Sequence, residues 1–104
     1  MADLREVGIL DRIATVDERG VERALLVARA LRRVGRRVVF DPLPDKSLRA
    51  QLRRANDLQV RFVLILGETE VRERAVTIKR MSDGSQETIA EDRVGARLAE
   101  MAGA

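Results

Sequence analysis

Residues 60–66 (VRFVLIL) form a short apolar run that ends at Gly67. A run of this length with so few polar positions is typical of a strand buried on both faces, as in the middle of a parallel sheet. Parallel strands need crossover connections, which are usually helices that cover the faces of the sheet. The run therefore predicts an α/β fold with residues 60–66 as a central strand.

Two amphipathic segments precede this strand, and each follows a shorter apolar stretch. In residues 18–34 and 46–58 apolar side chains recur at helical spacing, and Gly35 is a typical helix terminator. The predicted inward faces consist of Val21, Ala24, Leu25, Ala28, Leu31 and Val34 in the first helix and of Leu48, Leu52 and Ala55 in the second. Residues 10–16 and 38–40 are predicted strands. This alternation of strands and helices favours a parallel sheet.

The last third of the chain has the pattern of a hairpin followed by a helix. Residues 75–81 alternate between apolar and polar side chains, as a half-buried strand does. The dipeptide Asp83-Gly84 before residues 86–89 is a strong hairpin signal. Residues 91–101 carry apolar side chains at helical spacing, which predicts a C-terminal helix.

The connections complete the predicted architecture. Residues 67–70 are a predicted turn, and residues 41–45 (DPLPD) are a predicted loop, because neither proline fits a central strand. Together the elements predict a five-stranded mixed sheet, with three parallel strands plus an antiparallel hairpin, and three helices. We expect one such domain over residues 10–104, preceded by an extension or linker at residues 1–9.

Missing residue types exclude several classes of function. The 104 residues include neither cysteine nor histidine, which excludes disulfides, thiolate zinc sites and histidine-based acid–base catalysis. No G-x-G-x-x-G or P-loop pattern is present, so the sequence predicts no cofactor and no metal, and an enzyme is the least favoured class. No apolar run approaches the roughly 20 residues of a transmembrane helix. The N-terminus has no signal-peptide pattern, so a cytoplasmic protein with no membrane partner is expected.

Basic residues are concentrated in the middle of the chain. The net charge is +3, but residues 29–61 contain ten basic and three acidic side chains. Such a segment is either a candidate surface for a polyanion or a solvated arginine-rich face. The two aromatic residues, Phe40 and Phe62, both lie in predicted strands. A sheet that stacks unpaired bases on several aromatic rings is therefore not expected.

The predicted loop and turn both follow carboxyl ends of strands, where ligands of open α/β sheets bind. The start of the second helix offers free backbone N–H groups and carries Lys46 and Arg49, a combination that suits phosphate groups. Glu70 and Lys79 are candidates for contacts to base edges, because a carboxylate accepts from an amino group and an ammonium donates to a carbonyl or ring nitrogen. The residues themselves thus favour a binding module over a catalyst.

Three motifs occur in combination: residues 46–51 (KSLRAQ), 65–70 (ILGETE) and 76–79 (VTIK). Together they resemble the C-terminal anticodon-binding domain of class II aminoacyl-tRNA synthetases, with the closest match to histidyl-tRNA synthetase. The resemblance covers residues 10–101 and implies five mixed strands with three helices. It also implies a role in translation, with the anticodon stem-loop of a tRNA, of histidine type, as the partner.

The resemblance implies roles for individual residues. Glu70, after the Gly-Glu-x turn, and Lys79, at the end of the next strand, would read anticodon bases. Polar residues at the start of the second helix would approach the anticodon loop, and these are Asp45, Lys46, Ser47 and Gln51. The class II catalytic motifs are missing, so the chain is not expected to aminoacylate tRNA by itself. It is either an excised domain or a stand-alone paralogue of a tRNA ligase.

A hypothesis from a different class stays open. The chain can instead be a protein-interaction, dimerisation or regulatory domain that keeps this fold without binding tRNA, as a homodimer or with a catalytic subunit. Arg54 and Arg74 depart from the residues usual in the family, which favours this alternative. Under it, Glu70 and Lys79 would form a cross-strand ion pair of little energetic value.

Overall fold

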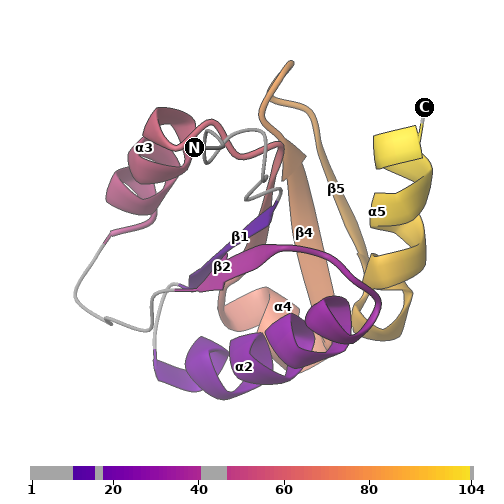
Figure 1. Ribbon diagram of the computed structural model, residues 1–104. Helices are drawn as coiled ribbons and strands as arrows, with labels where there is room; N and C mark the ends of the chain where they lie inside the picture. The colour runs from indigo at the N-terminus through magenta and orange to yellow at the C-terminus, as the bar shows by residue number, and fades with distance from the viewer. Residues whose placement is uncertain (1–10, 16–17, 41–46, 104) are drawn as a thin grey trace.

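The computed structural model describes residues 11–15, 18–40 and 47–103, and Figure 1 shows the arrangement of its elements. In chain order these are β1 (Asp11–Thr15), α2 (Glu18–Arg33), β2 (Val38–Phe40), α3 (Leu48–Asp57), β3 (Phe62–Leu66), α4 (Glu68–Glu73), β4 (Ala75–Arg80), β5 (Gln86–Ala90), a 3₁₀ turn (Glu91–Arg93) and α5 (Val94–Gly103). The predicted extension at residues 1–9 and the predicted loop at residues 41–45 lie outside the described residues.

The five strands form one mixed sheet in the order β2-β1-β3-β4-β5. Strand β1 pairs in parallel with β2 and with β3, whereas β4 pairs antiparallel with β3 and with β5. This confirms the predicted three parallel strands plus an antiparallel hairpin. The apolar run became β3, which lies in the middle of the sheet and is buried along its whole length.

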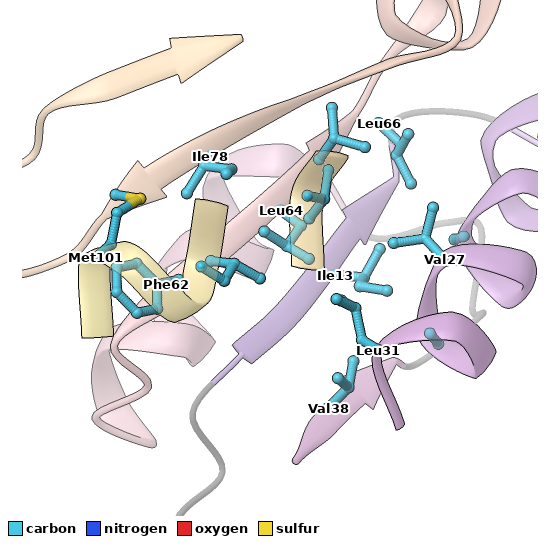
Figure 2. Close-up of a cluster of buried hydrophobic side chains, with 14 residues drawn as sticks. Ile13, Val27, Leu31, Val38, Phe62, Leu64, Leu66, Ile78 and Met101 are labelled. Atoms are coloured by element: carbon cyan, nitrogen blue, oxygen red, sulfur yellow. The ribbon is translucent and has the colours of Figure 1, made fainter. Parts of the chain in front are cut away.

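The main hydrophobic core lies between one face of the sheet and helices α2 and α5. Figure 2 shows Val27 and Leu31 of α2 pointing toward Ile13 of β1, and Met101 of α5 beside Phe62 of β3. The shared cluster continues through the other buried apolar side chains of this face. The burial of these apolar side chains therefore holds α2 and α5 against the sheet.

A smaller cluster fills the opposite face. Ala55 of α3 packs there with Ala14, Val63 and Ile65 of the strands, and Met81 covers its margin. Figure 1 shows α3 beside β1, away from β4 and β5. Among the described helices, α3 alone covers this face, and it covers only the β1 and β3 side.

The structure has four α-helices in its described part where three were predicted. The segment after β3, predicted as a turn at residues 67–70, begins the short helix α4 instead. The Gly67 N–H donates to the Glu70 carboxylate at 2.8 Å, which satisfies a free donor at the start of the helix. Arg74 then adopts a left-handed conformation with φ of 51°, which ends the helix before β4.

The buried face of α2 differs from the predicted one. Ala24, Val27, Ala28 and Leu31 are buried, whereas Leu25 and Val34 are 54% and 69% exposed. Both exposed residues were predicted to face inward. The buried four follow the i, i+3, i+4, i+7 spacing of a single helical stripe, from which Leu25 is offset by one residue.

Strand β1 is polar in sequence yet lies in the sheet interior between β2 and β3. The fully buried Asp11 carboxylate accepts two hydrogen bonds from the Arg36 guanidinium, at 2.6 and 2.9 Å. These bonds raise the pKa of Arg36 above its ordinary value, against the lowering effect of burial. The same guanidinium lies 5.9 Å from the centre of the Phe62 ring. A bidentate ion pair thus makes a charged position tolerable inside the sheet.

Candidate functional site

Helix α3 is anchored at the carboxyl end of β1 by a single side chain. The Gln51 amide donates to the Thr15 carbonyl at 2.7 Å, and its oxygen accepts from the Thr15 N–H at 3.2 Å. Gln51 is 4% exposed, so its amide faces the sheet and not the surface. This double hydrogen bond fixes the first turns of α3 beside the ends of β1 and β3.

The first turn of α3 is capped and exposed. The Ser47 hydroxyl accepts from the Ala50 N–H at 3.1 Å, as an N-cap residue does. Arg49 and Arg53 are exposed and one helical turn apart, so both guanidinium groups extend from the same side of the helix. Asp45 and Lys46, also predicted at this site, lie outside the described residues.

Glu70 lies at the beginning of α4, directly after β3. One of its carboxylate oxygens accepts from the Gly67 N–H, and the side chain is half-buried. The helix start and the acidic residues of its first turn favour each other electrostatically. The carboxylate is therefore held in one orientation at the carboxyl edge of the sheet.

Lys79 lies on β4, where its neighbours across the strands are Val63 of β3 and Gln86 of β5. Because Val63 belongs to the α3-side cluster, Lys79 projects from the same face as α3. Val63 is three residues from the end of β3, so about 10 Å along the sheet separates Lys79 from that end, and α4 begins two residues further on. Glu70 and Lys79 are thus on different kinds of element, and the predicted cross-strand ion pair between them is wrong.

The register adds polar residues that the sequence analysis did not single out. Thr77 lies opposite Thr88, and their hydroxyl groups are 2.8 Å apart. With Lys79 and Gln86 they form the open half-sheet, a polar surface on β4 and β5 that none of the described helices covers. The alternating pattern of residues 75–81 predicted a polar face on this strand, but only the pairing with β5 brings the four side chains together.

The chemistry of this region is hydrogen bonding and charge. The open half-sheet and the start of α3 present an ammonium, hydroxyls, an amide and guanidinium groups on one face of the sheet. Helix α4, which contacts α2 and β4, presents the Glu70 carboxylate beyond the carboxyl end of β3. Among the described residues no three acidic side chains come close enough together to hold a metal ion. The arrangement suits a ligand with phosphates and base edges.

In the part of the chain that the structure describes, no helix has the length and apolar character needed to cross a membrane.

The sequence matches one protein family over nearly its whole length. The family described as "Anticodon binding domain" matches residues 3–101. The histidine–tRNA ligase of Thermoanaerobacter sp. (strain X514) is 37% identical over 86 residues, which are 83% of this chain and 20% of the ligase. That of Lactobacillus delbrueckii subsp. bulgaricus is 42% identical over 64 residues, which are 62% of this chain and 15% of the ligase. The chain thus spans about a fifth of the length of such relatives.

Solved structures with the same fold include domains of three kinds of synthetase. The RNA-binding domain of threonyl-tRNA synthetase from Cryptosporidium parvum matches 88% of this chain and 23% of its own, with a TM-score of 0.79 and 27% identity. The histidyl-tRNA synthetase of S. aureus matches 93% of this chain and 24% of its own, with a TM-score of 0.79 and 24% identity. A prolyl-tRNA synthetase from C. parvum matches 89% of this chain and 20% of its own, with a TM-score of 0.83 and 13% identity.

Proposed function

Since this chain belongs to the anticodon-binding domain family, we propose that it binds the anticodon loop of a tRNA, of histidine type, in the cytoplasm. The single observation that carries this proposal is the open half-sheet, which places Lys79 on the same face as α3 and beside a row of hydroxyl and amide groups. A polar surface of this kind recognises unstacked bases by hydrogen bonds and needs no aromatic platform.

Glu70 and Lys79 read two different bases of the anticodon in this proposal. Lys79 lies about 10 Å along the sheet from the carboxyl end of β3, and Glu70 lies beyond that end on α4, so the two side chains reach different nucleotides of the loop. Glu70 accepts from a base amino group with a carboxylate that the Gly67 N–H already orients. Lys79 donates to a base carbonyl or ring nitrogen. Thr77, Thr88 and Gln86 line the surface next to Lys79.

The start of α3 contacts the backbone of the loop. Lys46, Ser47 and Arg49 approach the phosphates there, and Arg53 extends the same side of the helix by one turn. Asp45 approaches the loop as a hydrogen-bond acceptor. The resemblance implies that Gln51 approaches the anticodon loop directly, but in this proposal its role is indirect. It positions α3 through its two hydrogen bonds to Thr15.

The chain carries no aminoacylation activity of its own in this proposal. It matches the anticodon-binding domain alone, about a fifth of the length of the related ligases, and the amino-acid activating part lies elsewhere in those proteins. The chain serves either as one domain of a histidyl-tRNA synthetase or as a stand-alone paralogue that delivers tRNA affinity.

A binding titration tests this function. We expect the chain to bind an anticodon stem-loop with the histidine anticodon more tightly than a loop with scrambled anticodon bases, measured by fluorescence anisotropy at two salt concentrations. Glu70→Gln keeps an acceptor for the Gly67 N–H but loses the charge, and Lys79→Met loses the donor. Each variant is expected to reduce the preference between the loops about tenfold.

The matched control is Glu73→Gln, which removes the same charge from the exposed end of α4 and is expected to leave the preference unchanged. Equal binding of both loops by the wild-type chain would show that the bases are not read. Absence of any binding would favour the second candidate, a protein-interaction or dimerisation domain. That candidate has an observation of its own, the exposed Leu25, Leu26 and Val34 on and after α2.

A further inference from the structure

A hollow of about 500 Å³ lies at the end of the sheet where β3 begins. The buried residues Val60 and Phe62 line it, together with Met81 after the end of β4 and Met101 of α5. Met81 borders the apolar cluster under α3, whereas Met101 belongs to the core under α5. The hollow therefore lies across the end of the sheet and has an apolar floor.

The charged side chains of this hollow are two arginines, Arg61 and Arg80. Arg80 lies opposite Phe62 across the strands, and the Arg61 guanidinium lies 5.6 Å from the centre of the Phe62 ring. Both side chains therefore converge on one buried ring. None of the ion pairs among the described residues involves either arginine.

Acidic residues stand near the hollow in the chain, but none of the described ones lines it. Asp57 ends α3, and Asp83 lies in the turn after β4. The Asp83 carboxylate accepts from the Ser85 hydroxyl at 2.7 Å and from the Ser85 N–H at 2.9 Å. These bonds, followed by the charge of Arg80, lower the pKa of Asp83. Asp83 is thus held toward Ser85, and the described lining carries two positive charges and no negative one.

Neutral polar groups complete the rim of the hollow. Asn56 and Gln59 contribute amides from the end of α3, and Ser82 contributes a hydroxyl. The carboxyl end of a helix is partially negative, which disfavours an anion. Here the carbonyls of residues 54–56 already accept from the N–H groups of residues 58–60. An apolar floor with a polar, positively charged rim suits a ligand that has an anionic group and a flat body with hydrogen-bonding edges.

The hollow continues the open half-sheet at its hairpin end. Lys79 directly precedes Arg80, and Met81 is on the same face as Lys79, about 7 Å further along the chain. A strand of RNA that leaves Lys79 in this direction reaches the hollow next. Its next nucleotide has a phosphate and a base, which are the two parts that the rim and the floor accommodate.

We propose that this hollow binds one nucleotide, with its phosphate between Arg61 and Arg80 and its base over Met81. Guanidinium groups bind phosphate oxygens through charge-assisted hydrogen bonds, and the apolar floor reduces screening of these charges. The inference rests on the proposed function in one respect, because it assigns this nucleotide to the RNA strand whose neighbouring bases lie on the open half-sheet.

The site itself is tested without RNA. The isotope-labelled full chain is titrated with adenosine monophosphate, with adenosine and with inorganic phosphate, and the backbone amide signals are followed by NMR. We expect adenosine monophosphate to shift the signals of residues 59–62 and 80–82 with a Kd of about 1 to 10 mM. Adenosine and inorganic phosphate, which each lack one part, are expected to bind about tenfold more weakly.

Two double variants, both with unchanged side-chain length on average and both checked by their denaturation midpoints, show which charges matter. Arg61→Gln/Arg80→Gln is expected to abolish the shifts caused by adenosine monophosphate. Arg29→Gln/Arg33→Gln removes the same charge from exposed positions on α2, outside the hollow, and is expected to leave the shifts unchanged.

The same variants test the place of the hollow in RNA binding. The two arginines hold one phosphate, so Arg61→Gln/Arg80→Gln is expected to weaken the histidine and the scrambled stem-loop alike, about tenfold, and to lower the magnitude of the salt slope by about 0.7. The preference between the loops stays, because a phosphate contact reads no base. Arg29→Gln/Arg33→Gln is expected to change neither quantity.

Failure of this inference differs from failure of the proposed function. A wild-type chain that binds both loops equally would reject base reading, while tenfold weakening of both by Arg61→Gln/Arg80→Gln would still support the hollow. A normal preference that this variant leaves at full affinity would overturn the hollow alone, and absence of binding to either loop would overturn both.

Two results with small probes would also overturn the inference. Inorganic phosphate that binds as tightly as adenosine monophosphate would reduce the hollow to a general anion site. A glutamate hexapeptide that shifts the same signals at lower concentration than the nucleotide would assign the hollow to an acidic segment of a protein.

Discussion

Asp11 is a charged residue that lies fully buried in the interior of the sheet. Its carboxylate is fully buried, and the Arg36 guanidinium that it binds is 10% exposed. Removing one partner of a buried pair leaves the other charge without compensation, whereas apolar residues can replace the whole pair at little cost. Removing one partner and then both therefore tests how β1 tolerates this buried charge.

Asp11→Ala is expected to lower the free energy of unfolding by about 3 kcal/mol, because Arg36 loses both acceptors in a buried position. Chemical denaturation measures this loss. The double variant Asp11→Ala/Arg36→Met is expected to recover part of it, since no unpaired charge remains. Glu100→Ala, which breaks an exposed ion pair with Arg97, is the control and should leave the denaturation midpoint unchanged. A double variant less stable than Asp11→Ala would show that the unpaired charge of Arg36 is not the cause of the loss.

At the scale of the elements, α3 combines a small apolar face with one buried polar contact to the sheet. Its cluster with the sheet is small, and two of its apolar residues, Leu48 and Leu52, are only partly buried. Gln51 binds both backbone polar groups of Thr15, which is itself buried at the end of β1. The orientation of the basic first turn of α3 thus rests on this side chain.

Gln51→Ala is expected to cost about 2 kcal/mol of unfolding free energy and to loosen α3 selectively, because it leaves the Thr15 N–H and carbonyl without their partners. Amide hydrogen exchange is the measurement, and we expect faster exchange in α3 while α2 keeps its protection. Arg53→Ala, on the exposed side of the same helix, is the control. Uniform loss of protection across all helices would contradict a local role for Gln51.

Elements with one unambiguous pattern could be predicted from the sequence, and those that depend on tertiary context could not. Strand β3 is apolar on both faces, so its burial follows from composition alone. Helix α4 has six residues without an apolar stripe, and its start depends on a backbone cap at Gly67. In α2 apolar residues occupy two adjacent stripes, and contact with Ile13 and the rest of the core selects Val27 over Leu25.

The same division holds for the candidate site. The sequence predicted Ser47 and Arg49 at the start of a helix and Glu70 in a turn after a strand, both near the carboxyl edge of the sheet. The structure places Glu70 in helix α4, which was not predicted. The burial of Gln51 depends on how α3 docks on β1, which local spacing does not encode. The open half-sheet depends on the register of β4 with β5, and a shift by one residue would send Thr77 and Lys79 to the other face.

For the whole molecule, the basic segment of the sequence divides between two faces. Arg49 and Arg53 are exposed on α3, which covers the same face of the sheet as the open half-sheet, whereas Arg29 and Arg33 are exposed on α2, which covers the opposite face. The net charge of +3 is small, so long-range attraction alone does not decide where a polyanion binds. If RNA binds only the face that carries α3, the arginines of α2 should not contribute to its affinity.

The salt dependence of RNA binding distinguishes the two faces. Each phosphate contact to a single strand adds about 0.7 to the slope of log K against log salt, so Arg49→Ala/Arg53→Ala is expected to lower the magnitude of the slope by about 1.4. Arg29→Ala/Arg33→Ala removes the same charge from α2 and is expected to change the slope little. Binding of the anticodon stem-loop over a range of salt concentrations measures both. Equal loss of slope in the two double variants would mean that RNA also contacts α2.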